Sequence, residues 1–236
     1  MEFRLKNITK FYDELAVLQH FSIDFIPGRI NCVLGPSGCG KTTLLNIIAG
    51  LTSPDEAEYN GFLEKKISYI FQEDRLLPWK TVRDNIRFVL QSQYDGSQLD
   101  EIIDKNIALI DLKEFSGYYP HQLSGGMKRR VSIARAFSYP SEVILLDEPF
   151  KGIDISLKQS LMVSIRKIWE FDRRTLIYVT HDIEESVALG HRIFVFTGRP
   201  AKIIRHFDQP GNPGPGRGFT EGDLRLKEEI RKLMLP

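Results

Sequence analysis

The stretch that decides the fold is INCVLGPSGCGKTT, residues 30–43. Its second half fits the pattern G-x-x-x-x-G-K-[ST] between an apolar run, Ile30–Leu34, and a helical pattern from Lys41 to about Ala49. Glycines let the backbone wrap closely around phosphate, and the N-terminus of a helix adds the positive end of its dipole. The stretch therefore predicts a strand, a phosphate-binding loop (P-loop) and a helix.

Two side chains of this loop carry predicted chemistry. Lys41 is expected to reach the β- and γ-phosphates of ATP as a catalytic residue, and the Thr42 hydroxyl is expected to bind Mg²⁺. A glycine-rich turn with a solvated lysine is the alternative, but the complete match in the right context argues against it. The predicted nucleotide-binding set is Gly35, Pro36, Ser37, Gly38, Cys39, Gly40, Lys41, Thr42 and Thr43.

A second apolar run, Val143–Leu146, ends in two carboxylates. At the carboxyl end of a strand beside the P-loop strand, Asp147 would hold Mg²⁺ directly or through water. Glu148 would then orient the water that attacks the γ-phosphate and take its proton, as a catalytic base. Two exposed acids closing a strand would look the same in isolation, and the P-loop favours the catalytic interpretation.

Apolar runs alternate with helical patterns along most of the chain. This alternation is typical of an α/β fold with a mixed, largely parallel sheet, here a P-loop NTPase core. Phe3 and Leu5 alternate with charged residues, which predicts an antiparallel edge strand and an N-terminal antiparallel β subdomain. The other predicted strands are Leu176–Val179 and Ile193–Phe196, and the other predicted helices are about Ile155 to Phe171 and Glu184–Leu189.

Two segments differ from this alternation. Between about residues 81 and 140 the strand signal disappears and isoleucines recur at helical spacing, which predicts a helical insert. Residues 209–218, QPGNPGPGRG, predict a linker without regular structure, followed by an amphipathic helix with Leu226, Ile230 and Leu233 on one face. We therefore expect one ATPase domain over residues 1–208 and an appended linker and helix over 209–236.

The composition excludes several classes of function. The 32 basic and 31 acidic residues give a net charge of +1, so bulk electrostatics predict no nucleic-acid partner. The two cysteines, Cys32 and Cys39, have no metal-site spacing and are typical of a reduced, cytoplasmic compartment. The apolar runs fall far short of the roughly 20 residues that span a bilayer. We expect the chain not to cross a membrane.

With these motifs in place, the chain closely resembles an ATP-binding subunit of an ABC transporter. Leu123-Ser124-Gly125-Gly126-Met127 is similar to the LSGGQ signature of that family and stands 20 residues before Asp147 (147 − 127). The resemblance covers about residues 1–207. It identifies Gln72 with the Q-loop, Asp154 with the D-loop, His181 with the switch histidine and Tyr12 with the aromatic residue that stacks on adenine.

The resemblance implies a mechanism and a set of partners. Two copies would pack head to tail, so that Ser124, Gly125, Gly126 and Asp154 of one copy complete the ATP site of the other. Gln72, also a Mg²⁺ contact, and His181 would sense the γ-phosphate as catalytic residues. ATP hydrolysis would then power import through separate transmembrane permease subunits, served indirectly by a solute-binding protein. The chain would be peripheral, on the cytoplasmic face of the cell membrane.

Alternatives remain open at this stage. One is a soluble ABC-type ATPase acting on DNA or ribosomes, against which the near-neutral charge and the lack of a long coiled-coil insertion or a second cassette in this sequence argue. Another is a small-molecule kinase, which would share the P-loop but has no use for the LSGGM segment. Phe11 competes with Tyr12 for the stacking role, and a lone histidine such as His181 is more often structural. The stretches FQEDRLLPW (71–79), YYPHQLSGGM (118–127) and RPAKIIRHF (199–207) resemble the nitrate/sulfonate/taurine importer group, which leaves the solute open.

Three further features carry expectations. The sequence departs from the family pattern at Lys151-Gly152-Ile153 and at Lys128-Arg129-Arg130, and we expect neither departure to touch a residue assigned to chemistry. The segment Leu76-Leu77-Pro78-Trp79 follows Gln72 in a predicted loop. Its large apolar side chains either pack on the core or form a docking patch for the permease, and the docking interpretation is favoured.

Overall fold

The central element is a six-stranded sheet in the order β5-β6-β7-β3-β8-β9, seen in the computed structural model, which describes residues 3–212, 214–216 and 218–234. The first five strands in this order run parallel, and β9 is antiparallel to β8. This confirms the predicted α/β class. The strands are β3 (Ile30–Leu34), β5 (Ile67–Ile70), β6 (Val143–Asp147), β7 (Thr175–Thr180), β8 (Arg192–Phe196) and β9 (Ile203–Asp208).

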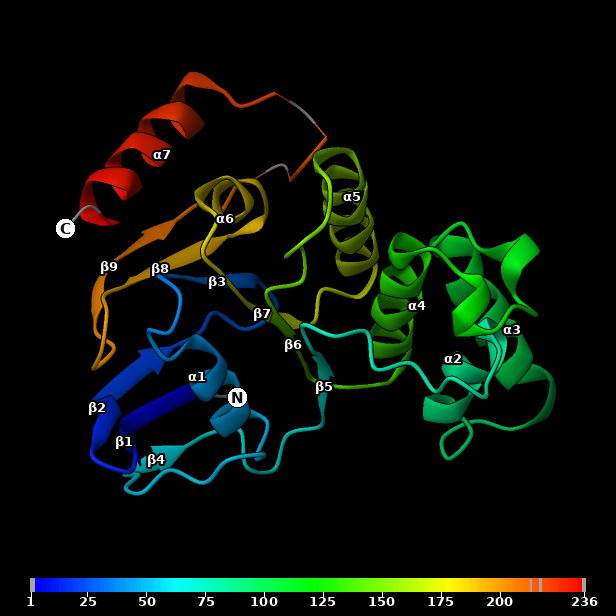
Figure 1. Ribbon diagram of the computed structural model, residues 1–236, viewed down its shortest axis with the longest axis horizontal. Helices are drawn as coiled ribbons and strands as arrows, with labels where there is room; N and C mark the ends of the chain where they lie inside the picture. The colour runs from blue at the N-terminus through cyan, green and yellow to red at the C-terminus, as the bar shows by residue number, and fades with distance from the viewer. Residues whose placement is uncertain (1–2, 213, 217, 235–236) are drawn as a thin grey trace.

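Both faces of this sheet are covered, which explains why its central strands read as continuous apolar runs. On β6, Ile144 and Leu146 belong to one core cluster, whereas Val143 and Leu145 belong to another. Helix α1 (Lys41–Ile48) lies between this sheet and the smaller N-terminal sheet. Helices α5 (Ile155–Asp172) and α6 (Ile183–Leu189) cover the opposite face (Figure 1).

The N-terminal sheet has three antiparallel strands in the order β2-β1-β4. These are β1 (Arg4–Tyr12), β2 (Leu15–Asp24) and β4 (Tyr59–Asn60). The predicted antiparallel pairing is confirmed, but the prediction of an edge strand is wrong, because β1 is the middle strand. Strand β4, which has two residues and no sequence pattern that predicts it, pairs with the side of β1 that β2 does not cover.

The predicted helical insert consists of α2 (Val82–Leu90), α3 (Gly96–Leu109) and α4 (Gly125–Ser138), with 3₁₀ turns at Lys113–Phe115 and Pro120–Gln122. These helices pack together at one end of the molecule, beyond β5 (Figure 1). The insert is therefore attached to the sheet on the side of the Q-loop, which directly follows β5.

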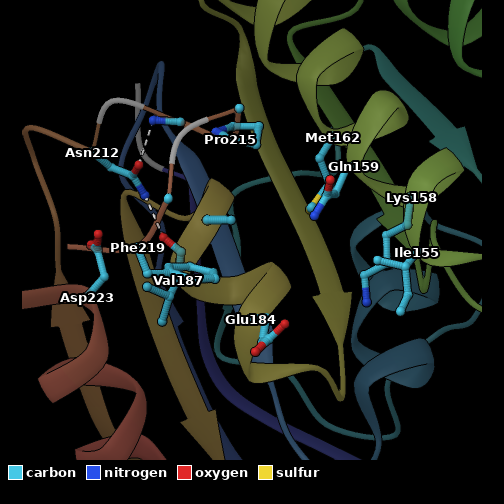
Figure 2. Close-up of a pocket in the computed structure, with 14 residues that line it drawn as sticks. Ile155, Lys158, Gln159, Met162, Glu184, Val187, Asn212, Pro215, Phe219 and Asp223 are labelled. Carbon is cyan, nitrogen blue, oxygen red and sulfur yellow. Dashed lines mark hydrogen bonds between the residues drawn. The ribbon is translucent and has the colours of Figure 1, made fainter. Parts of the chain in front are cut away.

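The C-terminal segment returns to the sheet. The described residues of 209–218 form no helix or strand, and α7 (Glu221–Met234) then packs against α6 and β8. Ile230 is fully buried, so the predicted apolar face of this helix is directed at the core. A cavity of about 420 Å³ lies between α5, α6 and this segment, with Met162, Val187 and Phe219 in its lining (Figure 2). Within the described residues, no helix is long and apolar enough to span a membrane.

Candidate nucleotide-binding and catalytic site

The sheet order brings the predicted motifs to one edge. Strands β5, β6, β7 and β3 are parallel neighbours, so their carboxyl ends lie side by side. The P-loop follows β3, and Gln72 comes two residues after β5. Asp147 closes β6, and His181 directly follows β7. This edge of an open parallel sheet is where ligands characteristically bind.

The P-loop is shaped by glycine and closed by its lysine. Gly40 precedes helix α1 with φ of 106°, and a β-carbon there would lie 2.8 Å from Val17 Cγ1, so any other residue would be both strained and crowded. Lys41 is buried, and its Nζ donates hydrogen bonds of 2.8 Å to the carbonyl oxygens of Gly35 and Pro36. Its charge is therefore held inside the loop that would surround phosphates.

A cavity of about 360 Å³ lies beside the P-loop and includes Tyr12 in its lining. Tyr12 is half exposed there, as a residue that stacks on a base requires. Among the described residues, the lining does not include Phe11, whose backbone N–H donates instead to Asp55. The geometry thus favours Tyr12 over Phe11. The P-loop side of the cavity is lined by Gly38, Gly40, Lys41, Thr42 and Thr43.

The predicted metal ligands adjoin the same loop. Thr42 Oγ1 donates a 3.1 Å hydrogen bond to Asp147 Oδ1, and both residues line a cavity of about 400 Å³ together with Gln72. Burial raises the pKa of Asp147, and the hydrogen bonds from Thr42 and Tyr69 oppose this only in part. Hydroxyl, amide and carboxylate oxygens are the hard ligands that Mg²⁺ prefers, with substrate phosphates completing its shell.

This donor set fits Mg²⁺ held jointly by protein and nucleotide. No group of three or more histidine, cysteine or carboxylate side chains capable of holding a metal occurs in the part of the chain that the structure describes. A site built from one carboxylate, one hydroxyl and one amide therefore depends on phosphate oxygens for the remaining positions.

Glu148 has an unexpected partner. Its φ of 42° places it in the left-handed region, and the turn that follows brings Lys151 Nζ to 2.9 Å from Glu148 Oε2. His181 Nδ1 lies 3.6 Å from Glu148 Oε1. Burial alone would raise the pKa of Glu148, but Lys151 and the charges of His181 and Lys41 outweigh burial and lower it. The expectation that the departure at Lys151 touches no residue assigned to chemistry is therefore wrong.

The second departure also reaches the site. Arg129 is buried, and its guanidinium donates to the carbonyl oxygens of Pro149 and Phe71 at 2.8 Å and of Gln72 at 3.3 Å. It thereby joins the turn after β6 to the start of the Q-loop. The basic run 128–130 was visible in the sequence, but nothing in it indicated which of its residues points inward. Arg199, which donates to the Gly38 carbonyl and lines the P-loop cavity, was likewise missed.

The signature segment forms the exposed start of helix α4. Ser124 is the N-cap, and its Oγ accepts a 3.3 Å hydrogen bond from Met127 N. A β-carbon on Gly126 would lie 2.6 Å from Leu157 Cδ2, so this glycine permits close packing against α5. Asp154 caps α5 by accepting from Leu157 N at 3.0 Å.

The signature and the P-loop do not meet within one chain. Gly125, Gly126 and Asp154 line a cavity of about 310 Å³ with Gln72. Among the described residues, the linings of the two cavities at the P-loop include neither Ser124 nor the signature glycines. The P-loop and the start of α4 therefore lie on two separate surfaces, and each is the N-terminus of a helix, where backbone N–H groups can bind anions.

Comparisons of the sequence with known proteins identify the family of this chain. Residues 18–151 fit the family model described as ABC transporter. The chain belongs to the ABC transporter ATP-binding family. The Bacillus subtilis aliphatic sulfonates import ATP-binding protein SsuB is 41% identical over 211 residues, which cover 84% of this chain and 80% of that protein. The uncharacterized ABC transporter ATP-binding protein MJ0412 of Methanocaldococcus jannaschii is 36% identical and covers 86% of this chain and 80% of its own length.

Solved structures of this family share the fold. The dimeric structure of the ABC transporter cassette MJ0796 superimposes with a TM-score of 0.75 at 29% identity, covering 93% of this chain and 100% of that one. A dimeric post-hydrolysis state of the same cassette, bound to ADP and phosphate, gives 0.75 at 30% identity with the same coverage. Like these relatives, the chain of 236 residues is an ABC ATPase: it binds ATP and hydrolyses it.

Proposed function

We propose that this ABC ATPase powers the import of a small solute through a separate membrane permease by closing head to tail with a second copy around two ATP molecules. The observation that carries the proposal is the separation of the P-loop from the exposed helix N-terminus at Ser124–Gly126. Each surface is an incomplete phosphate site, so a second copy that supplies the missing half would complete both. In this proposal residues 1–208 are the ATPase domain and 209–236 an appended segment.

The chemistry at each composite site follows from the residues that line it. Lys41 and the loop amides would hold the β- and γ-phosphates, while Thr42, Asp147 and Gln72 would hold Mg²⁺, which neutralises the charge that develops on the phosphates. Glu148 would accept the proton of the attacking water. His181, 3.6 Å from Glu148, would contact the γ-phosphate and orient that carboxylate.

Closing would depend on a differential contact. An ATP molecule whose γ-phosphate reaches Ser124 of the partner stabilises the closed dimer, and its hydrolysis removes that contact. The MJ0796 cassette is dimeric in both solved structures, which supports the pairing of two copies. The energy released on closing would pass to the permease through the Q-loop and the helical insert, which are adjacent in the fold.

The direction of transport is inferred from relatives. Several related proteins with 36–41% identity are named aliphatic sulfonates import ATP-binding proteins. We infer import of a small organic solute, with the chain on the cytoplasmic face of the cell membrane, where it would meet ATP. A solute-binding protein would deliver the solute to the permease.

Transport in proteoliposomes tests this proposal. The complex of this chain with its co-purifying permease is reconstituted with ATP inside or outside the vesicles, and uptake of a labelled aliphatic sulfonate is measured. Uptake that needs ATP on the side of this chain and stops with Glu148→Gln supports the proposal. If the chain is recovered only in the soluble fraction and DNA or ribosomes stimulate its ATPase activity, the proposed transport function is wrong.

A further inference from the structure

Tyr69 on strand β5 lies beside Asp147, the predicted Mg²⁺ ligand. No sequence motif indicates a role for this tyrosine. Its hydroxyl lies 3.4 Å from Asp147 Oδ2 and 3.2 Å from Asn46 Oδ1. The other carboxylate oxygen, Asp147 Oδ1, accepts from Thr42. Each oxygen of the metal carboxylate therefore has its own hydroxyl neighbour, one from β5 and one from the first turn of α1.

The ring that carries this hydroxyl is fixed by a stack. Tyr69 and Phe71 are stacked with centroids 4.1 Å apart and planes 17° apart, and the guanidinium of Arg75 lies 3.7 Å from the centre of the Phe71 ring. The Phe71 carbonyl in turn accepts from buried Arg129. A side chain held in this way keeps its hydroxyl in one place with little loss of entropy on binding.

We propose that Tyr69 is a positioning residue of the magnesium site. Its single hydroxyl proton, which Asn46 Oδ1 and Asp147 Oδ2 can both accept, is donated to Asp147 Oδ2 when the metal is bound. This hydrogen bond fixes the carboxylate plane, which leaves Oδ1, beside the Thr42 hydroxyl, directed at the metal. Partners of this kind orient metal ligands, and their loss characteristically lowers metal affinity about 10- to 100-fold. The proposal rests on the proposed role of Asp147 and deepens it.

The stack extends this role toward the Q-loop. Phe71 is the residue immediately before Gln72, so a movement of the Q-loop main chain would shift the ring on which Tyr69 rests. Metal affinity and Q-loop position are thereby coupled through two neighbouring aromatic rings.

Calorimetry with Tyr69→Phe tests the hydroxyl alone, because the variant keeps the ring and its stack. Binding of a non-hydrolysable ATP analogue is measured over a series of Mg²⁺ concentrations and in EDTA, together with the melting temperature. The distance of 3.4 Å between the hydroxyl and the carboxylate is long, so we expect the loss of Mg²⁺ affinity to be about tenfold, at the lower end of the 10- to 100-fold range. In the titration, the Mg²⁺ concentration at which half of the increase in nucleotide affinity is reached should rise by about this factor. Affinity in EDTA and the melting temperature should stay at the parental values.

The matched control is Tyr59→Phe, which removes a hydroxyl from an exposed tyrosine on β4 and should behave as the parent does. Parental Mg²⁺ dependence in Tyr69→Phe, or an equal loss of affinity in EDTA, would overturn the proposal. Phe71→Leu should shift the Mg²⁺ dependence in the same direction, and its failure to do so would remove the role of the stack. If the parent itself binds the analogue without any Mg²⁺ dependence, the metal site of the proposed function fails instead.

Discussion

Lys41 is the residue on which nucleotide affinity should depend most. Its buried ammonium group is held by two loop carbonyls, so it is already placed where phosphate oxygens would bind. Lys41→Ala removes this charge, and we expect ATP affinity to fall by at least about tenfold, the scale of one charge-assisted hydrogen bond. Unchanged ATP affinity by calorimetry would count against the assignment.

Glu148 should affect turnover rather than binding. It lies 3.6 Å from His181, at the edge where the attacking water would stand, and shares the lining of the P-loop cavity with Lys41. Glu148→Gln keeps the shape but not the basicity, so ATPase turnover should fall by about 10²–10⁴ while ATP binding is retained. Steady-state hydrolysis at the parental rate would show that another group is the base.

The residues predicted from sequence lie together because strand ends and motifs determine their positions. The P-loop, Asp147, Glu148 and His181 all follow apolar runs, and parallel strands bring such positions to one edge. The ion pair of Glu148 with Lys151 was not predictable, because it depends on the left-handed conformation of Glu148, which no local pattern announces. Arg129 was missed for a related reason: the burial of one arginine in a basic run is decided by tertiary packing.

Among the elements, the segment after the Q-loop is the one that we expect to couple the chain to the permease. Leu76 packs against the core and Leu77 is half buried, with its backbone held by Asn85, whereas Trp79 is 69% exposed. The four apolar residues therefore divide between the two interpretations. Trp79 is the side chain that we expect to dock.

We predict that Trp79→Ala lowers solute uptake several-fold and leaves basal ATPase activity and melting temperature nearly unchanged, because an exposed side chain contributes little to stability. The matched control is Tyr59→Ala, which removes an aromatic side chain with 43% exposure on β4 of the N-terminal sheet. Leu76→Ala should instead lower the melting temperature by several degrees. A loss of stability in Trp79→Ala comparable to that in Leu76→Ala would place the docking surface elsewhere.

The strands differ in how well their local sequence predicts them. The central strands β3, β6, β7 and β8 are buried on both faces and were recognisable as apolar runs. Strand β9 is mostly exposed and its apolar residues do not alternate with polar ones, and β4 has two residues, so neither carries a period that marks a strand. Because β1 pairs on its second side with β4, local sequence patterns cannot predict that β1 is the middle strand.

For the whole molecule, we expect ATP to complete two half-sites at once. The chain by itself should be monomeric, because the P-loop and the start of α4 lie in separate cavities. Ser124→Arg would place bulk and charge where the γ-phosphate bound to the partner must lie. This variant should therefore lose dimerisation while it keeps ATP binding on the side of Tyr12 and Lys41.

Light scattering of Glu148→Gln with ATP and Mg²⁺ tests this claim most directly, because the substitution blocks hydrolysis and preserves the bound state. We expect a mass of about 27.1 kDa without nucleotide and about twice that value with ATP and Mg²⁺, and no such increase when Ser124→Arg is added. A dimer that forms equally well without nucleotide, or a chain that stays monomeric at saturating ATP, would show that ATP does not join two half-sites.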